Sequence, residues 1–260
     1  MPKKAPTKKT VHPGRLVPLL AIALILSLSI FAYFTWLKSE SAKSGKTVEA
    51  PATIEVVAPV NLPKPSLTSR LSLEAALQAR RSRRDFTSDA LNLRQVGQML
   101  WSAQGITADW GGRTAPSAKS AYPLTVYLAA YNVVDLASGI YKYLPGKLEA
   151  AHQIQLVKKG DLRQPLGEAI GQNAAANPPA LLIIVGDMEI MAKAFDNVRH
   201  DNNVYLEAGH AAQNLYLEAE SLKLGMVTIA GFDGAKVAKA AGIPESETVI
   251  YAIPFGVPKP

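Results

Sequence analysis

The stretch VYLEAGHAAQNLYLEAESLKL, residues 204–224, carries the strongest periodic pattern in the chain. Its apolar residues recur at three- and four-residue steps, the spacing of one face of an α-helix, and the helix ends at Gly225. These residues are Val204, Ala208, Ala211, Ala212, Leu215, Ala219 and Leu222. Because alanine dominates this face, another backbone can approach closely, and we expect a second long helix to pack here. That helix belongs either to the same chain or to a second subunit.

Apolar runs on both sides of this helix predict strands. Residues 180–187, ALLIIVGD, form a continuous apolar run that fits a central strand buried on both faces. Residues 124–133 predict a strand, and GIYKYL, the Pro-Gly turn at 145–146 and KLEAA predict a hairpin. Short strands are expected at 225–232 and 248–256, and helices at 73–80 and 93–103. Helices and strands alternate without a regular βαβ repeat, so the predicted fold class is α+β.

Charge and composition exclude several classes of function. Nine lysines and arginines and three glutamates in residues 1–65 supply +6 of the net charge of +7. The remaining domain is nearly neutral, so we expect no nucleic-acid partner. Cysteine is absent, and the four histidines show no paired spacing, so we expect no metal site. The sequence also lacks a P-loop, a GxGxxG turn and a GxSxG elbow.

The N-terminal region predicts a membrane anchor. After a basic segment, 1–15, residues 16–37 contain no charge and are long enough to cross a bilayer as a helix. A cleaved signal peptide is the alternative, but its apolar region would be shorter and would end in small residues. Five basic residues precede the span and three lysines follow it closely, which predicts a single-pass protein with an extracytoplasmic domain. A proline-rich linker, 38–69, then leads to the folded domain, 70–260.

Two polar segments stand out within the folded domain. QARRSRRDF, residues 78–86, holds four arginines, and WGGRTAPSAKS, residues 110–120, adds cationic and hydroxyl groups. Guanidinium groups donate in a plane to phosphate or carbonyl oxygens, so these segments suit a phosphate and a polar ring edge. The alternative is that the arginines only complement the C-terminus of the helix at 73–80.

Six motifs in order resemble the nitroreductase superfamily and its SagB-type dehydrogenase branch. They are LEAALQARRSRRDF, RTAPSAKSAYPLTVYLA, GIYKYLP, EAIGQN, VYLEAGHAAQNLYLEAESLKLG and TIAGFD, and the resemblance covers residues 70–258. It implies an α+β fold with a central, mainly antiparallel sheet flanked by helices. It also implies a homodimer with two FMN sites at the subunit interface, in which the helix at 204–224 becomes the dimer helix.

The resemblance also implies the cofactor site. Arg80, Arg81, Ser82 and Arg84 would hold the phosphate, the ribityl chain and the N1/O2 edge of FMN. Further FMN contacts are implied at Pro116, Ser117 and Ser120, expected from the partner subunit, and at Thr228, Ala230 and Gly231 near flavin N5. Asn214 and Gln213 are expected to be structural. NAD(P)H is a possible reductant; if the domain is extracytoplasmic, a quinone or oxygen becomes the more probable redox partner. No catalytic acid or base is identified.

The chain departs from the branch pattern at three places. Lys119 stands where the branch usually has glycine, residues 194–203 do not reproduce the pattern of azoline-oxidising members, and Lys259 is the only basic residue at the C-terminal end. The sequence therefore favours a membrane-anchored FMN-dependent oxidoreductase of unidentified substrate. The alternative is a membrane-tethered flavin- or ligand-binding module without turnover.

Overall fold

The structure of the chain is a computed structural model that describes residues 30–36, 38, 58–146 and 152–260. Its folded unit, residues 56–260, is built on a seven-stranded sheet in the order β1-β4-β3-β2-β5-β7-β6, with every neighbouring pair antiparallel. The strands are β1 Val60–Asn61, β2 Leu124–Ala130, β3 Gly139–Leu144, β4 Gln153–Lys159, β5 Ala180–Gly186, β6 Gly225–Met226 and β7 Thr248–Gly256. This arrangement confirms the predicted α+β class and antiparallel sheet.

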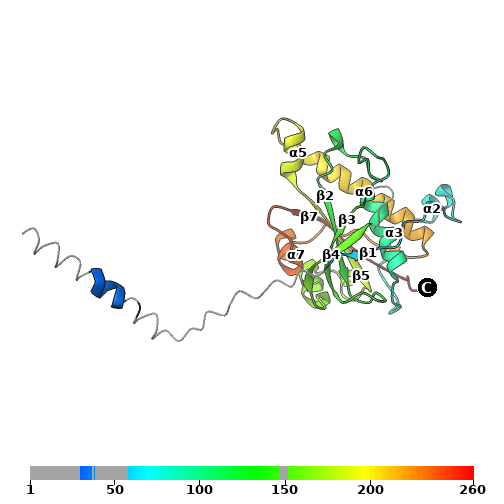
Figure 1. Cartoon of the computed structure of the whole chain (residues 1–260). Coiled ribbons are helices and arrows are strands. Elements are labelled where there is room, and N and C mark those ends of the chain that lie inside the picture. The colour runs from blue at the N-terminus through cyan, green and yellow to red at the C-terminus, as the bar shows by residue number, and fades with distance from the viewer. Residues whose placement is uncertain (1–29, 37, 39–57, 147–151) are drawn as a thin grey trace, which may run out of the picture. The chain divides into compact units, whose positions relative to one another are not determined.

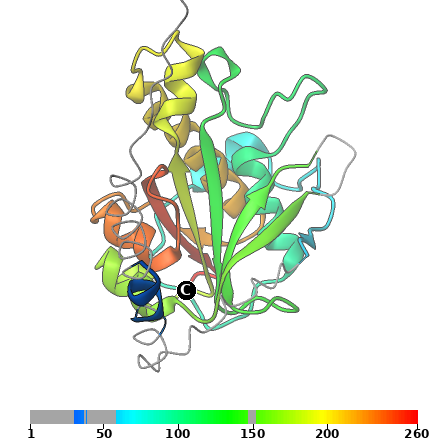
Figure 2. The same ribbon diagram turned by 60° about the vertical axis from the view of Figure 1, so that its left-hand side comes forward.

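Helices cover both faces of the sheet (Figures 1 and 2). On one face α3 and α6 pack over a large apolar core, and on the other α4 and α7 cover a second core. The helices are α2 Leu73–Ala79, α3 Leu93–Gln104, α4 Arg163–Ile170, α5 Met188–Ala194, α6 Asp201–Ser221 and α7 Gly234–Ala241, with short 3-10 turns η2 Ala118–Ser120 and η3 Asn173–Ala175. Successive residues of β5 point into alternate cores, which explains its continuous apolar sequence.

The alanine-rich face of α6 is buried inside its own chain. Val204, Ala208, Ala211 and Leu215 have no exposed surface, and α3 is the helix that packs most extensively against α6. The small side chains let α6 lie close to the sheet, where Val204 faces Gly186 at the end of β5. Of the two partners that the sequence allows for this face, the structure therefore supports the helix of the same chain.

Ordered structure begins earlier than the sequence predicts. β1 lies inside the predicted linker, 38–69, and pairs with β4 at the edge of the sheet. Leu62 is buried, its N–H donates to His152 O at 2.9 Å, and Ser66 exchanges hydrogen bonds with the Gln98 side chain. Pro63 and Pro65 exclude a helix, but an extended segment at a sheet edge tolerates proline.

Two other predictions fall partly outside the described residues. The hairpin forms, but its second strand is β4, and KLEAA, residues 147–151, is not described. The predicted membrane span, 16–37, is described only at residues 30–36, which are helical. Among the described parts of the chain, no helix has the length and apolar character needed to cross a membrane.

Candidate flavin site

Residues 78–86, called here the arginine segment, leave α2 and run beside the C-terminal half of α6. Ser72 caps the start of α2 by accepting from Ala75 N, and the helix ends at Arg80, whose N–H donates to Ala76 O. The Arg81 guanidinium donates to the carbonyl oxygens of Gln78 and Arg80, while Arg84 is exposed. These two guanidinium groups therefore keep most of their hydrogen-bonding capacity for a ligand.

Tyr216 of α6 joins three of the predicted site residues. Its hydroxyl lies 3.0 Å from Ser82 Oγ, accepts from Thr228 N at 3.1 Å and lies 3.4 Å from Thr228 Oγ1. The Arg80 guanidinium stacks over its ring, 5.1 Å from the centroid. Burial alone would raise the pKa of Tyr216, but the hydrogen bonds with Ser82 and Thr228 and the Arg80 charge together lower it.

The sequence did not single out Tyr216. One signal was present, because a tyrosine on the buried side of a helix needs a partner for its hydroxyl. The identity of that partner depends on segments 134 and 12 residues away along the chain. Only the fold shows that the arginine segment and the Thr228 segment meet at this helix.

Arg83 differs from its three neighbouring arginines. Its guanidinium pairs with Glu220 of α6, and its N–H donates to Met226 O of β6. A Cβ atom added to Gly225 would lie 3.0 Å from Arg83 Cβ, so the backbones approach closely here. Arg83, which is not among the predicted cofactor residues, therefore fixes the segment to the fold.

The segment after Thr228 presents backbone to solvent. Ile229 bridges to Ala252 of β7, and Ala230 and Gly231 are exposed. In the hydrogen bonds of the described residues, the N–H groups of Ala230 and Gly231 have no acceptor. A Cβ atom at Gly231 would meet only Gln172 Nε2, at 3.7 Å, so packing within this chain does not require glycine. Free amides beside an exposed glycine fit the close approach of a planar ligand.

The second predicted group lies on the loop 113–122. Ser117 Oγ accepts from Tyr122 N at 2.8 Å, Pro116 is exposed, and Lys119, Ser120 and Tyr122 have left-handed φ values of 51°, 53° and 49°. Among the described contacts, none joins Pro116, Ser117 or Ser120 to the arginine segment or to the Thr228 segment. The predicted residues therefore form two separate groups within one chain.

The loop 113–122 is tied to helices at both ends. Asn214 Nδ2 of α6 donates to Thr114 O at 3.1 Å, which is a structural role, as predicted for Asn214. Lys119, one of the departures from the branch pattern, places its ammonium 4.6 Å from the centre of the Phe195 ring. Phe195 begins the connection between α5 and α6, so this departure links the loop to the other unusual segment.

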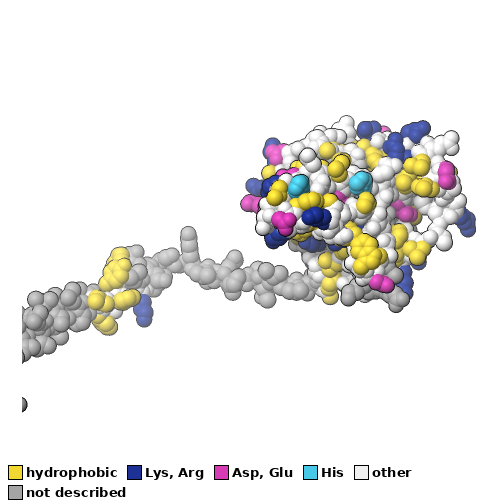
Figure 3. Space-filling view, turned by 90° about the horizontal axis from the view of Figure 1, so that it is seen from above, with side chains coloured by type: hydrophobic (Ala, Val, Ile, Leu, Met, Phe, Trp, Pro, Cys, Tyr) yellow, Lys and Arg dark blue, Asp and Glu magenta, His cyan; other side chains and the backbone are white. Residues whose placement is uncertain are grey.

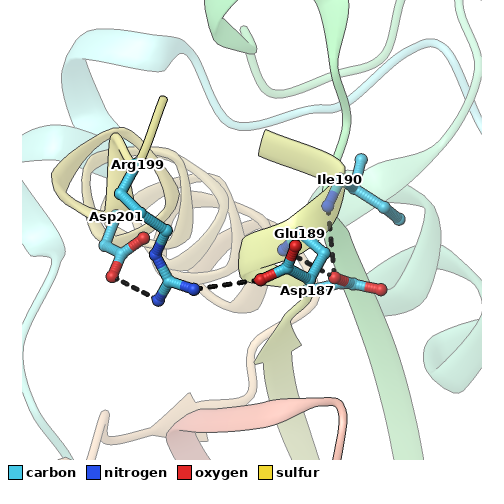
Figure 4. A network of polar contacts seen from close by, with 5 residues as sticks. All are labelled: Asp187, Glu189, Ile190, Arg199 and Asp201. Carbon is cyan, nitrogen blue, oxygen red and sulfur yellow. Dashed lines mark hydrogen bonds and ion pairs between the residues drawn. The ribbon is translucent and has the colours of Figure 1, made fainter. Parts of the chain in front are cut away.

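Ion pairs organise that connection (Figure 4). Asp187 caps α5 by accepting from the N–H groups of Glu189 and Ile190, at 2.9 and 3.2 Å. Arg199 then bridges Glu189 of α5 and Asp201 of α6, at 3.0 and 2.7 Å. All of these side chains are exposed or nearly so, so the pairs orient the two helices more than they stabilise them.

A buried carboxyl lies beneath the loop. Glu207 of α6 is 2% exposed, and neither of its carboxyl oxygens has a hydrogen-bond partner. Burial raises the pKa of Glu207 to about 7, although Ser117, Arg113 and Gln104 are near enough to oppose part of this effect. Nothing in the sequence distinguishes this residue, because a glutamate on a helix is usually exposed.

Comparisons with known proteins identify relatives of this chain. A profile of the nitroreductase family matches residues 77–257. A provisionally named nitroreductase of Methanocaldococcus jannaschii is 35% identical over 184 residues, which cover 70% of this chain and 90% of that protein. The crystal structure of a provisionally named nitroreductase of Ralstonia eutropha is 28% identical and has a TM-score of 0.67, covering 81% of this chain and 94% of that one.

A more distant structure shares the fold alone. It is the NADPH:FMN oxidoreductase of Vibrio harveyi complexed with NAD⁺. Its sequence is 19% identical and its TM-score is 0.51, with 72% of this chain and 69% of that chain covered.

The raised pKa of Glu207 predicts a pH dependence of stability. The folded protein holds a proton on Glu207 that the unfolded chain releases near pH 4.5, so stability is greatest below that pH and falls as pH rises to about 7. The loss is about 3 kcal/mol. Glu207→Gln, which keeps the shape and cannot ionise, should remove it.

Urea unfolding of parent and variant between pH 5 and 8 measures this effect. The difference between the two proteins is the relevant quantity, because it cancels the titration of His152, whose burial lowers its pKa in both. The same dependence of unfolding free energy on pH in both proteins would show that Glu207 is ionised throughout.

Proposed function

We propose a flavin-dependent oxidoreductase function for this chain, because it belongs to the nitroreductase family. In this proposal FMN is the cofactor and the substrate is unidentified. The observation that carries the proposal is the contact of Arg80, Ser82 and Thr228 with one tyrosine, Tyr216. Assignment to the SagB-type branch is a finer proposal, supported by the order of the six sequence motifs.

The residues of the arginine segment have the chemistry that FMN requires. Arg80, Arg81 and Arg84 would bind the phosphate and the electron-rich N1/O2 edge, and Ser82 would donate to the ribityl chain. The free amides of Ala230 and Gly231 would face the ring near N5. Bound FMN supplies hydride exchange through N5, and positive charge near N1 favours its reduced form. The chain itself binds and orients the reactants.

A homodimer would complete this site. Pro116, Ser117 and Ser120 would then contact the flavin bound to the partner subunit, which accounts for their separation from the arginine segment within one chain. Apolar side chains at the α5 and α6 end of the domain support this proposal: Ile190, Val198, Tyr205 and Leu206 are 40–61% exposed. Figure 3 views this end and shows hydrophobic side chains interspersed with basic and acidic ones.

Charge removal from the arginine segment tests the cofactor site. Arg80→Ala and Arg84→Ala should each weaken FMN binding roughly ten- to a hundred-fold, because each loses a charged hydrogen bond worth about 1.5–3 kcal/mol. Arg94→Ala is the matched control, since Arg94 is exposed on α3 outside the proposed site. Fluorescence titration of the purified domain with FMN measures the affinities. Unchanged affinity in both site variants would reject the assignment.

The same preparation distinguishes oxidoreductase from binding module. NAD(P)H, which the family resemblance offers as a reductant, is tested first, followed by a quinol analogue and dithionite. Bleaching of the yellow protein, and its recovery with an added acceptor, would support an oxidoreductase. A yellow protein that no reductant bleaches would favour the module without turnover, and a protein that takes up no FMN would reject both.

The membrane anchor is a separate proposal that rests on sequence. The uncharged residues 16–37 would anchor the chain, and the excess of positive charge before them would place the domain outside the cytoplasm. A quinone or oxygen would then be a more available redox partner than NAD(P)H. Reporters that are active on only one side of the membrane, fused after Pro260, test the orientation. We expect signal from the extracytoplasmic reporter. Signal only from a cytoplasmic reporter would reverse the orientation and make NAD(P)H the natural reductant again.

A further inference from the structure

Glu207 occupies a position that neither core packing nor cofactor binding explains. It lies on α6 near Gln104 of α3 and near Arg113 and Ser117 of the loop 113–122, and it is almost completely buried. Both of its carboxyl oxygens and Gln104 Nε2 lack hydrogen-bond partners. Unpaired buried polar atoms are rare because each costs free energy, and Ser117 and Gln104 lie close enough to this carboxyl to become its partners after a small shift.

Arg113 is the cation that faces this carboxyl, and it is engaged elsewhere. Its guanidinium donates to Gln104 Oε1 at 2.7 Å and stacks on the Tyr122 ring, 4.9 Å from the centroid. No ion pair joins Arg113 to Glu207 among the described contacts. Glu207 is therefore a second partner near Arg113, with which Arg113 forms no ion pair in this conformation.

The other titratable groups nearby do not compensate an ionised Glu207. Burial raises the pKa of Tyr143 on β3, which keeps it neutral, and Tyr143 OH is bonded to His152 Nδ1 at 2.9 Å. His152 of β4 is buried, which lowers its pKa. Lys119, on the same loop, lies over the Phe195 ring. Arg113 is thus the group that would respond to a charge on Glu207.

The loop carries local backbone strain. Three non-glycine residues, Lys119, Ser120 and Tyr122, have left-handed backbones, which stores strain that the surrounding contacts must balance. Those contacts include the bond from Tyr122 N to Ser117 Oγ and the Arg113–Tyr122 stack. Moving Arg113 toward Glu207 would remove the stack.

We propose that Glu207 is a positioning residue for the loop 113–122. When Glu207 is protonated, Arg113 keeps its contacts with Gln104 and Tyr122. When Glu207 is ionised, it attracts Arg113 away from these contacts, and the loop shifts. The proposal rests on the proposed function, in which Ser117 and Ser120 contact FMN. Neutral Glu207 then corresponds to the conformation seen here and to the tighter flavin site. Ionised Glu207 corresponds to the weaker one.

Flavin binding at different pH values tests the proposal. FMN dissociation constants are measured for the parent chain, Glu207→Gln and Glu218→Gln between pH 6 and 8.5. The dissociation constant of the parent is divided by that of Glu207→Gln at each pH, because this ratio cancels the titration of the FMN phosphate itself. We expect this ratio to rise from near one at pH 6 to about ten at pH 8.5, equivalent to about 1.4 kcal/mol.

Glu218→Gln is the matched control. Glu218 lies on the same helix and burial also raises its pKa, but it borders a cleft with α2 and α3 instead of facing Ser117. The control should follow the parent at every pH. A ratio for Glu207→Gln that stays constant across the pH range would overturn the proposal, even if the variant is less stable.

A second measurement separates this proposal from the proposed function. Amide hydrogen exchange of residues 113–122 is measured without flavin. In the parent, the exchange rate should increase with pH by more than the intrinsic effect of pH on exchange. Glu207→Gln should show only the intrinsic effect. If neither protein binds FMN, the proposed function fails, but hydrogen exchange still tests the role of Glu207. The same pH dependence of exchange in the parent and in Glu207→Gln would reject that role.

Discussion

Close packing of α6 against the sheet and α3 is the constraint on which the candidate site depends. The alanines on its buried face permit this approach, and the residues around that face then hold the functional segments. Tyr216 contacts the arginine segment and Thr228, Glu220 pairs with Arg83, and Asn214 holds Thr114. A bulkier buried face would move the helix outward and separate these segments, so a packing requirement and a binding site share one helix.

The two halves of α6 create opposite electrostatic environments. Near its C-terminal end, Arg80 and several hydrogen bonds lower the pKa of Tyr216 and prepare a region suited to anionic groups. Toward its N-terminal end, burial raises the pKa of Glu207 and favours a neutral carboxyl. The first environment suits retention of a phosphate-bearing cofactor. The second suits control of the loop 113–122, because one proton there changes which partner Arg113 prefers.

The sequence predicted elements whose signal is local. The spacing of apolar residues located α6 to within a few residues, and the unbroken apolar run located β5. The predicted helix at 73–80 matches α2, Leu73–Ala79, to within one residue. The edge strand β1 was missed because two residues between prolines carry no periodic signal, and its pairing with β4 is a tertiary contact.

Site residues divide in the same way. The arginines could be selected from the sequence because their number and spacing are unusual, and the cofactor role that the resemblance implies for them stays a prediction. Tyr216 and Glu207 were not predictable, because their importance comes from what surrounds them: a hydroxyl that meets two distant segments, and a carboxyl enclosed by a loop, a helix and an arginine. Burial of an individual polar side chain on an amphipathic helix is decided by tertiary packing.

If the Tyr216 hydroxyl holds the segments of the proposed flavin site together, its removal in Tyr216→Phe should weaken FMN binding. Tyr141→Phe is the control, since it removes a similarly placed hydroxyl that donates to Ala137 O, far along the chain from the site segments. We expect Tyr216→Phe to weaken FMN binding about tenfold, equivalent to about 1.4 kcal/mol, while the control binds like the parent. Equal affinity in Tyr216→Phe and the parent would contradict this expectation.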